Sequence, residues 1–130
     1  MGLRVGIDLV SIDAVEESIR IHSARYLRRV YTSREVRDCR APDGAPDPRK
    51  LAGRFAAKEA ALKVLGVDDE AIPWQSIEVH NDRLGSPSIE LTGAAERLAQ
   101  QRGVTDLDLS ITHAGPLAAA IVVARVRDEC

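Results

Sequence analysis

Residues 49–66 read RKLAGRFAAKEAALKVLG and contain the clearest helix signal in the chain. Four apolar residues in this stretch recur at helical spacing and form one stripe: Leu51, Phe55, Leu62 and Leu65. Gly66 follows the last of them and is a typical residue at the end of a helix. The spacing therefore predicts a helix over residues 49–65, against which the remaining elements pack.

The segments before this helix predict one strand and two further helical regions. Apolar residues alternate over residues 3–9, which is typical of a half-buried strand with Asp8 on the side opposite the apolar row. Residues 12–31 have helical spacing with a break near His22 and Ser23, and Thr32 and Glu35 fit a capping box for a short helix to about residue 40. The Pro, Gly and Asp content of residues 41–48 predicts a loop.

The segments after it predict four strands and one helix. Strands are expected around residues 77–79 and 89–91, a helix from residue 92 to Gly103, and strands over residues 107–112 and 117–126. The order βαααββαββ predicts an α+β fold with helices packed on a largely antiparallel sheet. A length of 130 residues suits one domain, so we expect residues 1–130 to form it.

Composition excludes several classes of protein. The formal net charge is −2 and only 3% of residues are aromatic, which argues against nucleic-acid binding by overall charge or by base stacking. No stretch has the roughly 20 apolar residues of a membrane helix, and Asp8 interrupts any signal-peptide core, so we expect a cytoplasmic protein. Cys39 and Cys130 lie far apart without a C-x-x-C partner, and we expect two plain thiols.

The charges are distributed unevenly along the chain. Residues 20–63 contain 12 basic and 5 acidic side chains, a balance of 12 − 5 = +7, whereas the rest has 6 − 15 = −9. A basic segment in an acidic protein favours an anionic ligand or partner. The alternative is an arginine-rich, solvated helix surface.

Four residues have side chains suited to phosphate chemistry. Glu59 and Lys63 are four positions apart and share a helix face, which by itself is more typical of a surface salt bridge than of a site. Asp8 and His113, each taken alone, also have ordinary structural interpretations. Together, two carboxylates, a lysine and a histidine supply oxygen ligands for Mg²⁺ and cationic groups for phosphates, which phosphoryl-type transfer requires.

Three blocks of the chain resemble holo-acyl carrier protein synthases, the short type of 4′-phosphopantetheinyl transferase: GIDLV at residues 6–10, LAGRFAAKEAALKVLG at 51–66 and SITH at 110–113. The resemblance implies transfer of 4′-phosphopantetheine from coenzyme A to a serine of an apo acyl carrier protein. It also implies that Asp8 and Glu59 bind Mg²⁺ and that Lys63 binds the coenzyme A phosphates. Arg54 and His113 would lie around the nucleotide, and the turn from Gly85 to Pro87 beside the adenine.

The resemblance leaves the general base open, because Glu59, acting directly or through a water, and His113 are both candidates. Thr112 replaces a serine that is usual in the last block, and Ala14 stands where a basic residue often meets the carrier. Four arginines slightly further along are expected to face the acidic helix of a carrier protein: Arg20, Arg25, Arg28 and Arg29.

The resemblance further implies a homotrimer with active sites between neighbouring subunits. We expect the small residues Ala52, Ala56 and Ala60 to pack against a neighbour in that assembly. The alternative function is a catalytically weak module of the same fold that binds coenzyme A or a carrier protein. A nucleic-acid-binding domain is a third and weaker hypothesis, since the chain lacks aromatic residues and a known motif.

Overall fold

Helix α4, Pro48–Leu65, is the central element of the computed structural model, which describes residues 2–68 and 71–127. It confirms the helix predicted over residues 49–65. The Asp47 side chain accepts hydrogen bonds from the backbone N–H groups of Arg49 and Lys50, and Gly66 ends the helix in a left-handed conformation with φ 74°. Twelve of its 18 residues are buried, so the helix is enclosed on several sides and not along a single stripe.

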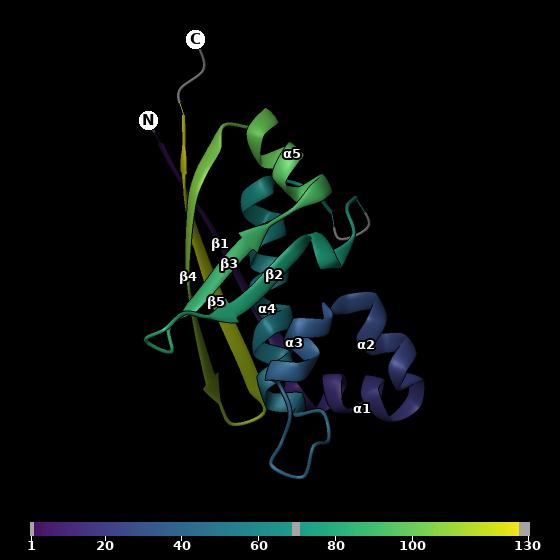
Figure 1. Cartoon of the computed structure of the whole chain (residues 1–130). Coiled ribbons are helices and arrows are strands. Elements are labelled where there is room, and N and C mark those ends of the chain that lie inside the picture. The colour runs from purple at the N-terminus through teal and green to yellow at the C-terminus, as the bar shows by residue number, and fades with distance from the viewer. Residues whose placement is uncertain (1, 69–70, 128–130) are drawn as a thin grey trace.

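Two antiparallel sheets surround this helix (Figure 1). The larger has the order β1-β5-β4, formed by Gly2–Ser11, Leu117–Val126 and Val104–Ala114. The smaller pairs β2, Ile77–Asn81, with β3, Pro87–Leu91. The α+β class and the antiparallel pairing are confirmed, with the strands divided between two sheets.

The helical segment over residues 12–30 is two helices, α1 Ile12–His22 and α2 Ala24–Val30, because Ser23 adopts φ 48° between them. The break near residue 23 was predicted, but the two parts were counted as one helix. Four helices therefore precede β2, and the observed order is βααααββαββ in place of the predicted βαααββαββ. The remaining helices are α3 Ser33–Asp38, α5 Gly93–Gln101 and the single 3₁₀ turn η1 Trp74–Ser76. Both hydrogen bonds of the Thr32–Glu35 capping box are present at the start of α3.

Two glycines allow α4 to lie directly on the large sheet. A Cβ atom at Gly6 of β1 would overlap the Ala60 carbonyl oxygen and come within 3.2 Å of the Lys63 Cβ. A Cβ at Gly53 of α4 would lie 3.0 Å from the Ile111 Cγ2 and 3.1 Å from the His113 Nε2 of β4. The helix is therefore in close contact with both edge strands of the sheet, β1 and β4.

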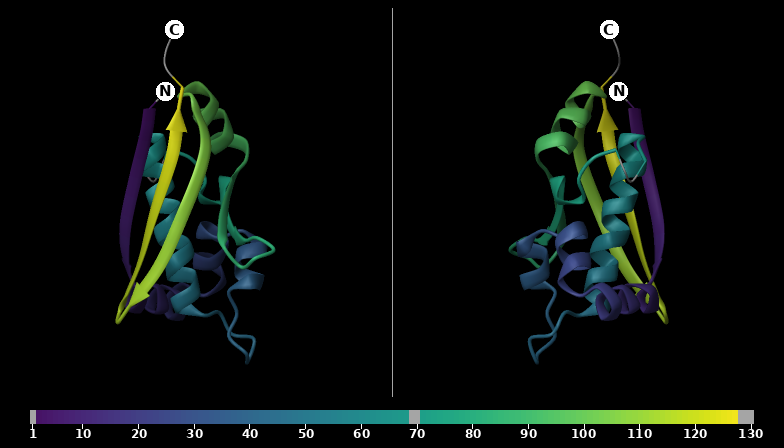
Figure 2. Two further views of the ribbon diagram at one scale, coloured as in Figure 1. Left: turned by 90° about the vertical axis from the view of Figure 1, so that its left-hand side faces the viewer. Right: turned by 90° about the vertical axis from the view of Figure 1, so that its right-hand side faces the viewer.

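The opposite side of the large sheet is open; it is apolar over β1 and most of β5 and polar over β4, where Asp108, Ser110 and Thr112 are exposed. The left panel of Figure 2 views this side, and none of the described helices lies in front of it. The apolar row of β1 is 60–70% exposed here: Leu3, Val5, Ile7 and Leu9. Asp8 lies on the opposite face of β1 from this row, as predicted. The face with Asp8 packs against α4, however, and the apolar row is exposed.

The small residues of α4 are core residues. Ala52, Ala56 and Ala60 are fully buried within the chain, beneath the sheet and the neighbouring helices. The prediction that they pack against a neighbouring subunit is therefore wrong. Small side chains at these positions allow close packing of α4 inside one chain, and the exposed apolar surface belongs to the sheet instead.

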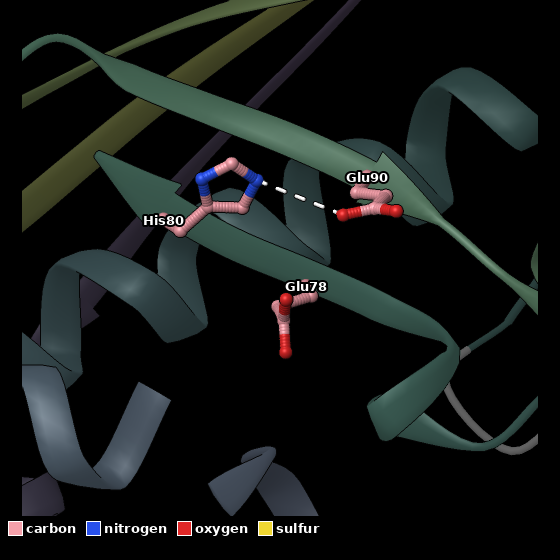
Figure 3. Close-up of side chains that lie close together, drawn as sticks. All are labelled: Glu78, His80 and Glu90. Carbon is pink, nitrogen blue, oxygen red and sulfur yellow. Dashed lines mark ion pairs between the residues drawn. The ribbon is translucent and has the colours of Figure 1, made fainter. Parts of the chain in front are cut away.

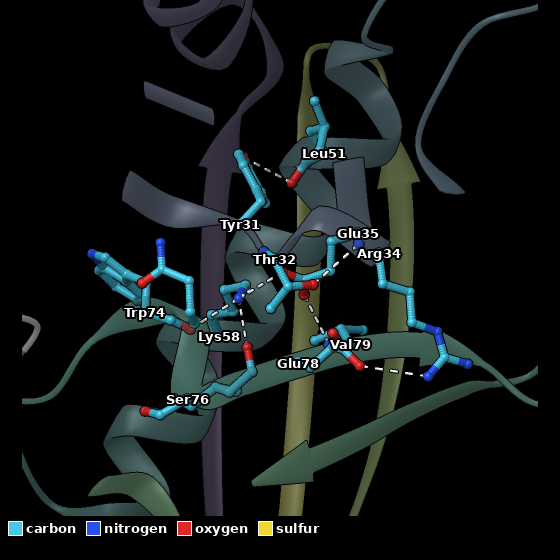
Figure 4. A network of polar contacts seen from close by, with 12 residues as sticks. Tyr31, Thr32, Arg34, Glu35, Leu51, Lys58, Trp74, Ser76, Glu78 and Val79 are labelled. Carbon is cyan, nitrogen blue, oxygen red and sulfur yellow. Dashed lines mark hydrogen bonds and ion pairs between the residues drawn. The ribbon is translucent and has the colours of Figure 1, made fainter. Parts of the chain in front are cut away.

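A buried ion pair fastens α3 and β2 to α4 (Figure 4). The side chains of Lys58 and Glu35 are both fully buried, and the Lys58 Nζ lies 2.7 Å from Glu35 Oε1. Lys58 also donates to the carbonyl oxygens of Trp74 and Ile77, while Glu35 Oε2 accepts from the Val79 N–H at 2.8 Å. Burial lowers the pKa of Lys58 and the Glu35 carboxylate opposes that shift, so each charge depends on the other.

Cys39 is a free, buried thiol, and burial raises its pKa, which makes it an unreactive core residue. Cys130 lies outside the described residues.

The loop predicted after α3 spans residues 41–47 and closes on itself, with hydrogen bonds from Ala41 N to Ala45 O and from Gly44 N to Ala41 O. Among the helices in residues 2–68 and 71–127, none combines the length and apolar character needed to cross a membrane.

Candidate active site

Lys63 and Asp8 form an ion pair at the β1 edge of α4. The Lys63 Nζ lies 2.7 Å from the Ile7 carbonyl oxygen and 3.3 Å from Asp8 Oδ1. The Asp8 side chain is 14% exposed, whereas that of Lys63 is 56% exposed. The exposed Lys63 side chain therefore lies along the edge strand β1, and its ammonium partly compensates the charge of the nearly buried Asp8 carboxylate.

The second Asp8 oxygen provides the observation that favours a cation here. Within the described part of the chain, Asp8 Oδ2 is buried and has no hydrogen-bond partner, which is costly for a carboxylate. Glu59 lies on α4 one turn before Lys63 and is half-buried. Burial raises the pKa of Tyr26, and its hydrogen bond with Tyr31 opposes this shift. The Glu59 carboxylate also raises the pKa of Tyr26, so the Glu59 charge lies near Tyr26 of α2.

These carboxylates fit the magnesium ligands expected from the sequence. Mg²⁺ prefers hard oxygen ligands and is usually held by one or two carboxylates together with water and substrate phosphates. Asp8 offers an oxygen without another partner among the described residues, and Glu59 offers a second carboxylate from the adjoining helix. The donor set is therefore suitable for Mg²⁺.

A second set of predicted residues lines a cleft of about 230 Å³ at the β4 edge of α4. Three of the residues predicted to surround the nucleotide border it: Arg54, Pro87 and His113. Gly85 is not one of its lining residues and lies in the exposed β2–β3 turn with φ 82°. The structure thus brings Pro87 to the cleft and leaves Gly85 at the tip of the hairpin.

The polar groups of this cleft suit an anionic ligand. Arg54 is only 9% exposed, and among the described residues its Nε atom is buried without a hydrogen-bond partner. His113 Nε2 lies 3.0 Å from the Arg49 carbonyl oxygen, so this nitrogen carries the hydrogen and donates it. The Nδ1 atom is therefore the nitrogen that can accept a hydrogen bond from a ligand.

Sequence reasoning missed Lys50 and Asn81, which also border the cleft. Lys50 lies four positions before Arg54, and this spacing was a usable signal because residues i and i+4 share a helix face. Asn81 ends β2, and nothing in its sequence context distinguished it from other turn residues. Asp38 lines the cleft as well, so two cations, one carboxylate and one histidine face it.

The two groups of predicted residues lie at opposite edges of the sheet. Lys63 adjoins β1, whereas Gly53 adjoins β4, and their separation of ten positions corresponds to about 15 Å along the axis of α4. Within one chain, the structure therefore brings Asp8 to Lys63 and brings Arg54 to His113, but keeps these pairs apart.

A family model for the 4′-phosphopantetheinyl transferase superfamily matches residues 4–122, a range that includes both of these edges. The chain belongs to this superfamily. The holo-[acyl-carrier-protein] synthase of Herpetosiphon aurantiacus is 40% identical over 128 residues, covering 93% of this chain and 97% of the relative. The protein of the same name from Moorella thermoacetica is 40% identical over 123 residues, covering 93% and 92%.

Solved structures of the superfamily have the same fold. The complex of the Chronobacterium ammoniagenes synthase with coenzyme A has a TM-score of 0.84 and 31% identity, covering 98% of this chain and all of that one. The acyl carrier protein synthase of Mycobacterium tuberculosis has a TM-score of 0.72 and 35% identity, covering 97% and 100%. The predicted family and fold are confirmed.

Proposed function

We propose that this chain is a holo-[acyl-carrier-protein] synthase, which transfers 4′-phosphopantetheine from coenzyme A to a serine of an apo acyl carrier protein. The serine oxygen forms a bond to the β-phosphorus of the coenzyme A pyrophosphate, and the bond from that phosphorus to the bridging oxygen breaks. The products are the holo carrier, joined by a phosphodiester, and adenosine 3′,5′-bisphosphate; the serine proton goes to a base. Membership of the superfamily, with relatives of this name at 40% identity, supports the assignment.

The observation that carries the chemistry is that the buried Asp8 Oδ2, beside Lys63, has no hydrogen-bond partner among residues 2–68 and 71–127. Asp8 and Glu59 would hold Mg²⁺, which supplies charge neutralisation at the pyrophosphate when it is bound. The flexible, half-exposed Lys63 ammonium can leave the Ile7 carbonyl and donate to the transferred phosphate as negative charge develops there. Arg54 supplies a fixed positive charge for the nucleotide at the β4 edge.

The arrangement favours Glu59 over His113 as the base that removes the serine proton. Glu59 is one turn from Lys63, so its carboxylate belongs to the β1 edge where the transferred phosphate is expected. His113 lies on Gly53 at the other edge, and its Nε2 hydrogen already binds the Arg49 carbonyl. In this proposal, His113 contacts the nucleotide end of coenzyme A and does not receive the serine proton.

The positions of the two edges support an active site shared between subunits of a homotrimer. Each chain presents Asp8 and Lys63 at its β1 edge and Arg54 and His113 at its β4 edge. Repeated contact of the β1 edge of one subunit with the β4 edge of the next would generate a closed ring. The exposed apolar row of β1, together with Ile121 of β5, supplies a surface that an assembly would bury. We therefore assign the contact between subunits to this sheet surface. The alanine face of α4, which the sequence suggested for that contact, is buried within the chain.

Mixed assemblies provide a test of this shared site. We expect Asp8→Asn and His113→Ala chains to be weakly active alone, and to recover activity when they are unfolded and refolded together. The recovery arises because some sites in a mixed trimer combine the intact edge of each variant; with random mixing about a quarter of sites are intact. Refolding each variant alone is the control. No recovery in mixtures that light scattering shows to be trimeric would place both groups in the site of one chain.

Carrier docking is assigned to the basic surface of α1 and α2. The four predicted arginines are exposed, and Arg28 and Arg29 border a cleft of about 600 Å³ that also includes Trp74. Exposed ion pairs contribute about 0–1 kcal/mol each and act mainly on association and orientation. This surface lies on different elements from the Arg54 cleft, so the two substrates would approach separately.

Reversing Arg25 and Arg28 to Glu is expected to raise the apparent KM for the carrier about tenfold at low salt, with little change in the KM for coenzyme A. The difference from wild type should shrink at physiological ionic strength, where the screening length is about 8 Å. The matched control changes Arg97 and Arg127 to Glu. Both are exposed arginines that lie outside α1 and α2. An unchanged carrier KM at low salt would place the docking surface elsewhere.

The reaction itself is tested by mass spectrometry of purified apo carriers after incubation with this chain, coenzyme A and Mg²⁺. A gain equal to one phosphopantetheine group supports the proposal and identifies the carrier class. Binding of coenzyme A or carrier without any mass gain would instead support the alternative, a catalytically weak binding module. A single domain over residues 1–130 and a cytoplasmic location belong to the same proposal.

A further inference from the structure

The outer face of the β2–β3 hairpin carries three side chains suited to metal binding (Figure 3). Glu78 and His80 are two positions apart on β2 and therefore share one face, and Glu90 of β3 is paired directly with Glu78. Each of the three offers a ligand atom, and these atoms all lie within 4.8 Å of one another. They come from the opposite face of the hairpin to Ile77 and Val79, which are buried in the core.

Two features of this group are unfavourable without a cation. Glu78 and Glu90 are like charges directly across an antiparallel pair, which destabilises the pairing. Arg34 partly compensates, since its Nη1 lies 3.5 Å from Glu78 Oε1, but that is longer than a good hydrogen bond. The two carboxylates and one guanidinium leave a net negative charge beside the His80 imidazole.

The orientation of His80 favours a metal ligand. Its Nδ1 faces the Asn81 carbonyl oxygen at 3.5 Å, so Nε2 is the ring nitrogen that faces Glu90. That Nε2 lies 3.7 Å from Glu90 Oε2, the contact drawn as a dashed line in Figure 3, and a metal ion between the two atoms would accept an electron pair from each. Two ligands on a tetrahedral zinc ion, with bonds of about 2.0–2.2 Å, lie about 3.3–3.5 Å apart, close to this separation.

We propose that Glu78, His80 and Glu90 form a binding site for a divalent transition metal, with Zn²⁺ as the occupant. One imidazole and two carboxylates are a set that zinc accepts, and a water would complete four-coordination. The Glu90 side chain is 58% exposed, whereas those of Glu78 and His80 are 19% and 18% exposed, so the ion would enter from solvent and join β2 to β3. The site is separate from the proposed magnesium ligands, which lie on β1 and α4.

The test measures Zn²⁺ binding by calorimetry in the full chain carrying Asp8→Asn and Glu59→Gln, so that the proposed magnesium site does not contribute. We expect binding of about one equivalent, lost on adding His80→Ala and weakened at least about tenfold on adding Glu90→Gln. Replacement by Co²⁺ should produce visible absorption bands of an imidazole-bound ion, absent in the His80 variant. His22→Ala, which removes an exposed histidine of α1, is the matched control and should change nothing.

No binding to the starting chain, or equal binding after His80→Ala, would overturn the proposal. Because Glu90 is exposed, its variant should keep the fold even if the histidine variant does not, and circular dichroism checks both. None of these measurements uses the transfer reaction. Failure of the zinc site and failure of the proposed transferase function therefore give different results.

Discussion

Asp8→Asn and Glu59→Gln are each expected to lower the turnover number by roughly 10³-fold or more, while the protein remains folded. Each substitution removes an anionic oxygen ligand from the proposed Mg²⁺ and keeps the size of the side chain. The measurement is the rate of holo-carrier formation at saturating coenzyme A, together with the thermal unfolding midpoint. Asp13→Asn on the first turn of α1 is the matched control and should retain full turnover.

The same chemistry predicts loss of turnover when the metal is removed. Excess chelator should abolish transfer by the wild-type chain, and added Mg²⁺ should restore it. Unchanged activity in chelator would contradict the assigned ligands. Activity that survives in both variants but not in chelator would instead move the metal site away from Asp8 and Glu59.

Lys58→Met is expected to destabilise the chain by about 3–5 kcal/mol, because it leaves the fully buried Glu35 carboxylate without its countercharge. Chemical denaturation followed by circular dichroism measures this change. Lys50→Met, on the same helix but exposed, should change stability by less than about 0.5 kcal/mol. The contrast separates the buried pair from a general effect of removing a lysine from α4.

The double variant Lys58→Met/Glu35→Gln should be less destabilised than Lys58→Met alone, because removing both charges removes the unpaired carboxylate. The introduced amide would keep an acceptor oxygen for only one of the two backbone N–H groups that Glu35 now binds, Thr32 N–H at Oε1 and Val79 N–H at Oε2, so part of the destabilisation should remain. If the double variant were destabilised by the sum of the single effects, the two side chains would be acting independently. That result would contradict the electrostatic coupling inferred from the structure.

Lys58 also illustrates what the sequence could not indicate about α4. The residue reads as one more charge in a helix with three lysines, two arginines and one glutamate, and no spacing rule connects it with Glu35, 23 positions earlier. Only tertiary packing brings the two together, with burial that excludes water from both. By contrast, the helix itself was predictable, because apolar spacing and the Gly66 stop are local properties of the chain.

The sequence by itself determined the family and the order of the elements, apart from the division at Ser23, since motifs, caps and periodicity are local. It also identified Asp8, Arg54, Glu59, Lys63 and His113 as candidate site residues. The tertiary structure decided how they are grouped, because α4 lies between two edge strands and separates Lys63 from His113. It also decided that the alanines of α4 are core and that the apolar row of β1 is exposed, because alternation shows that a strand has two faces but not which of them the helix covers.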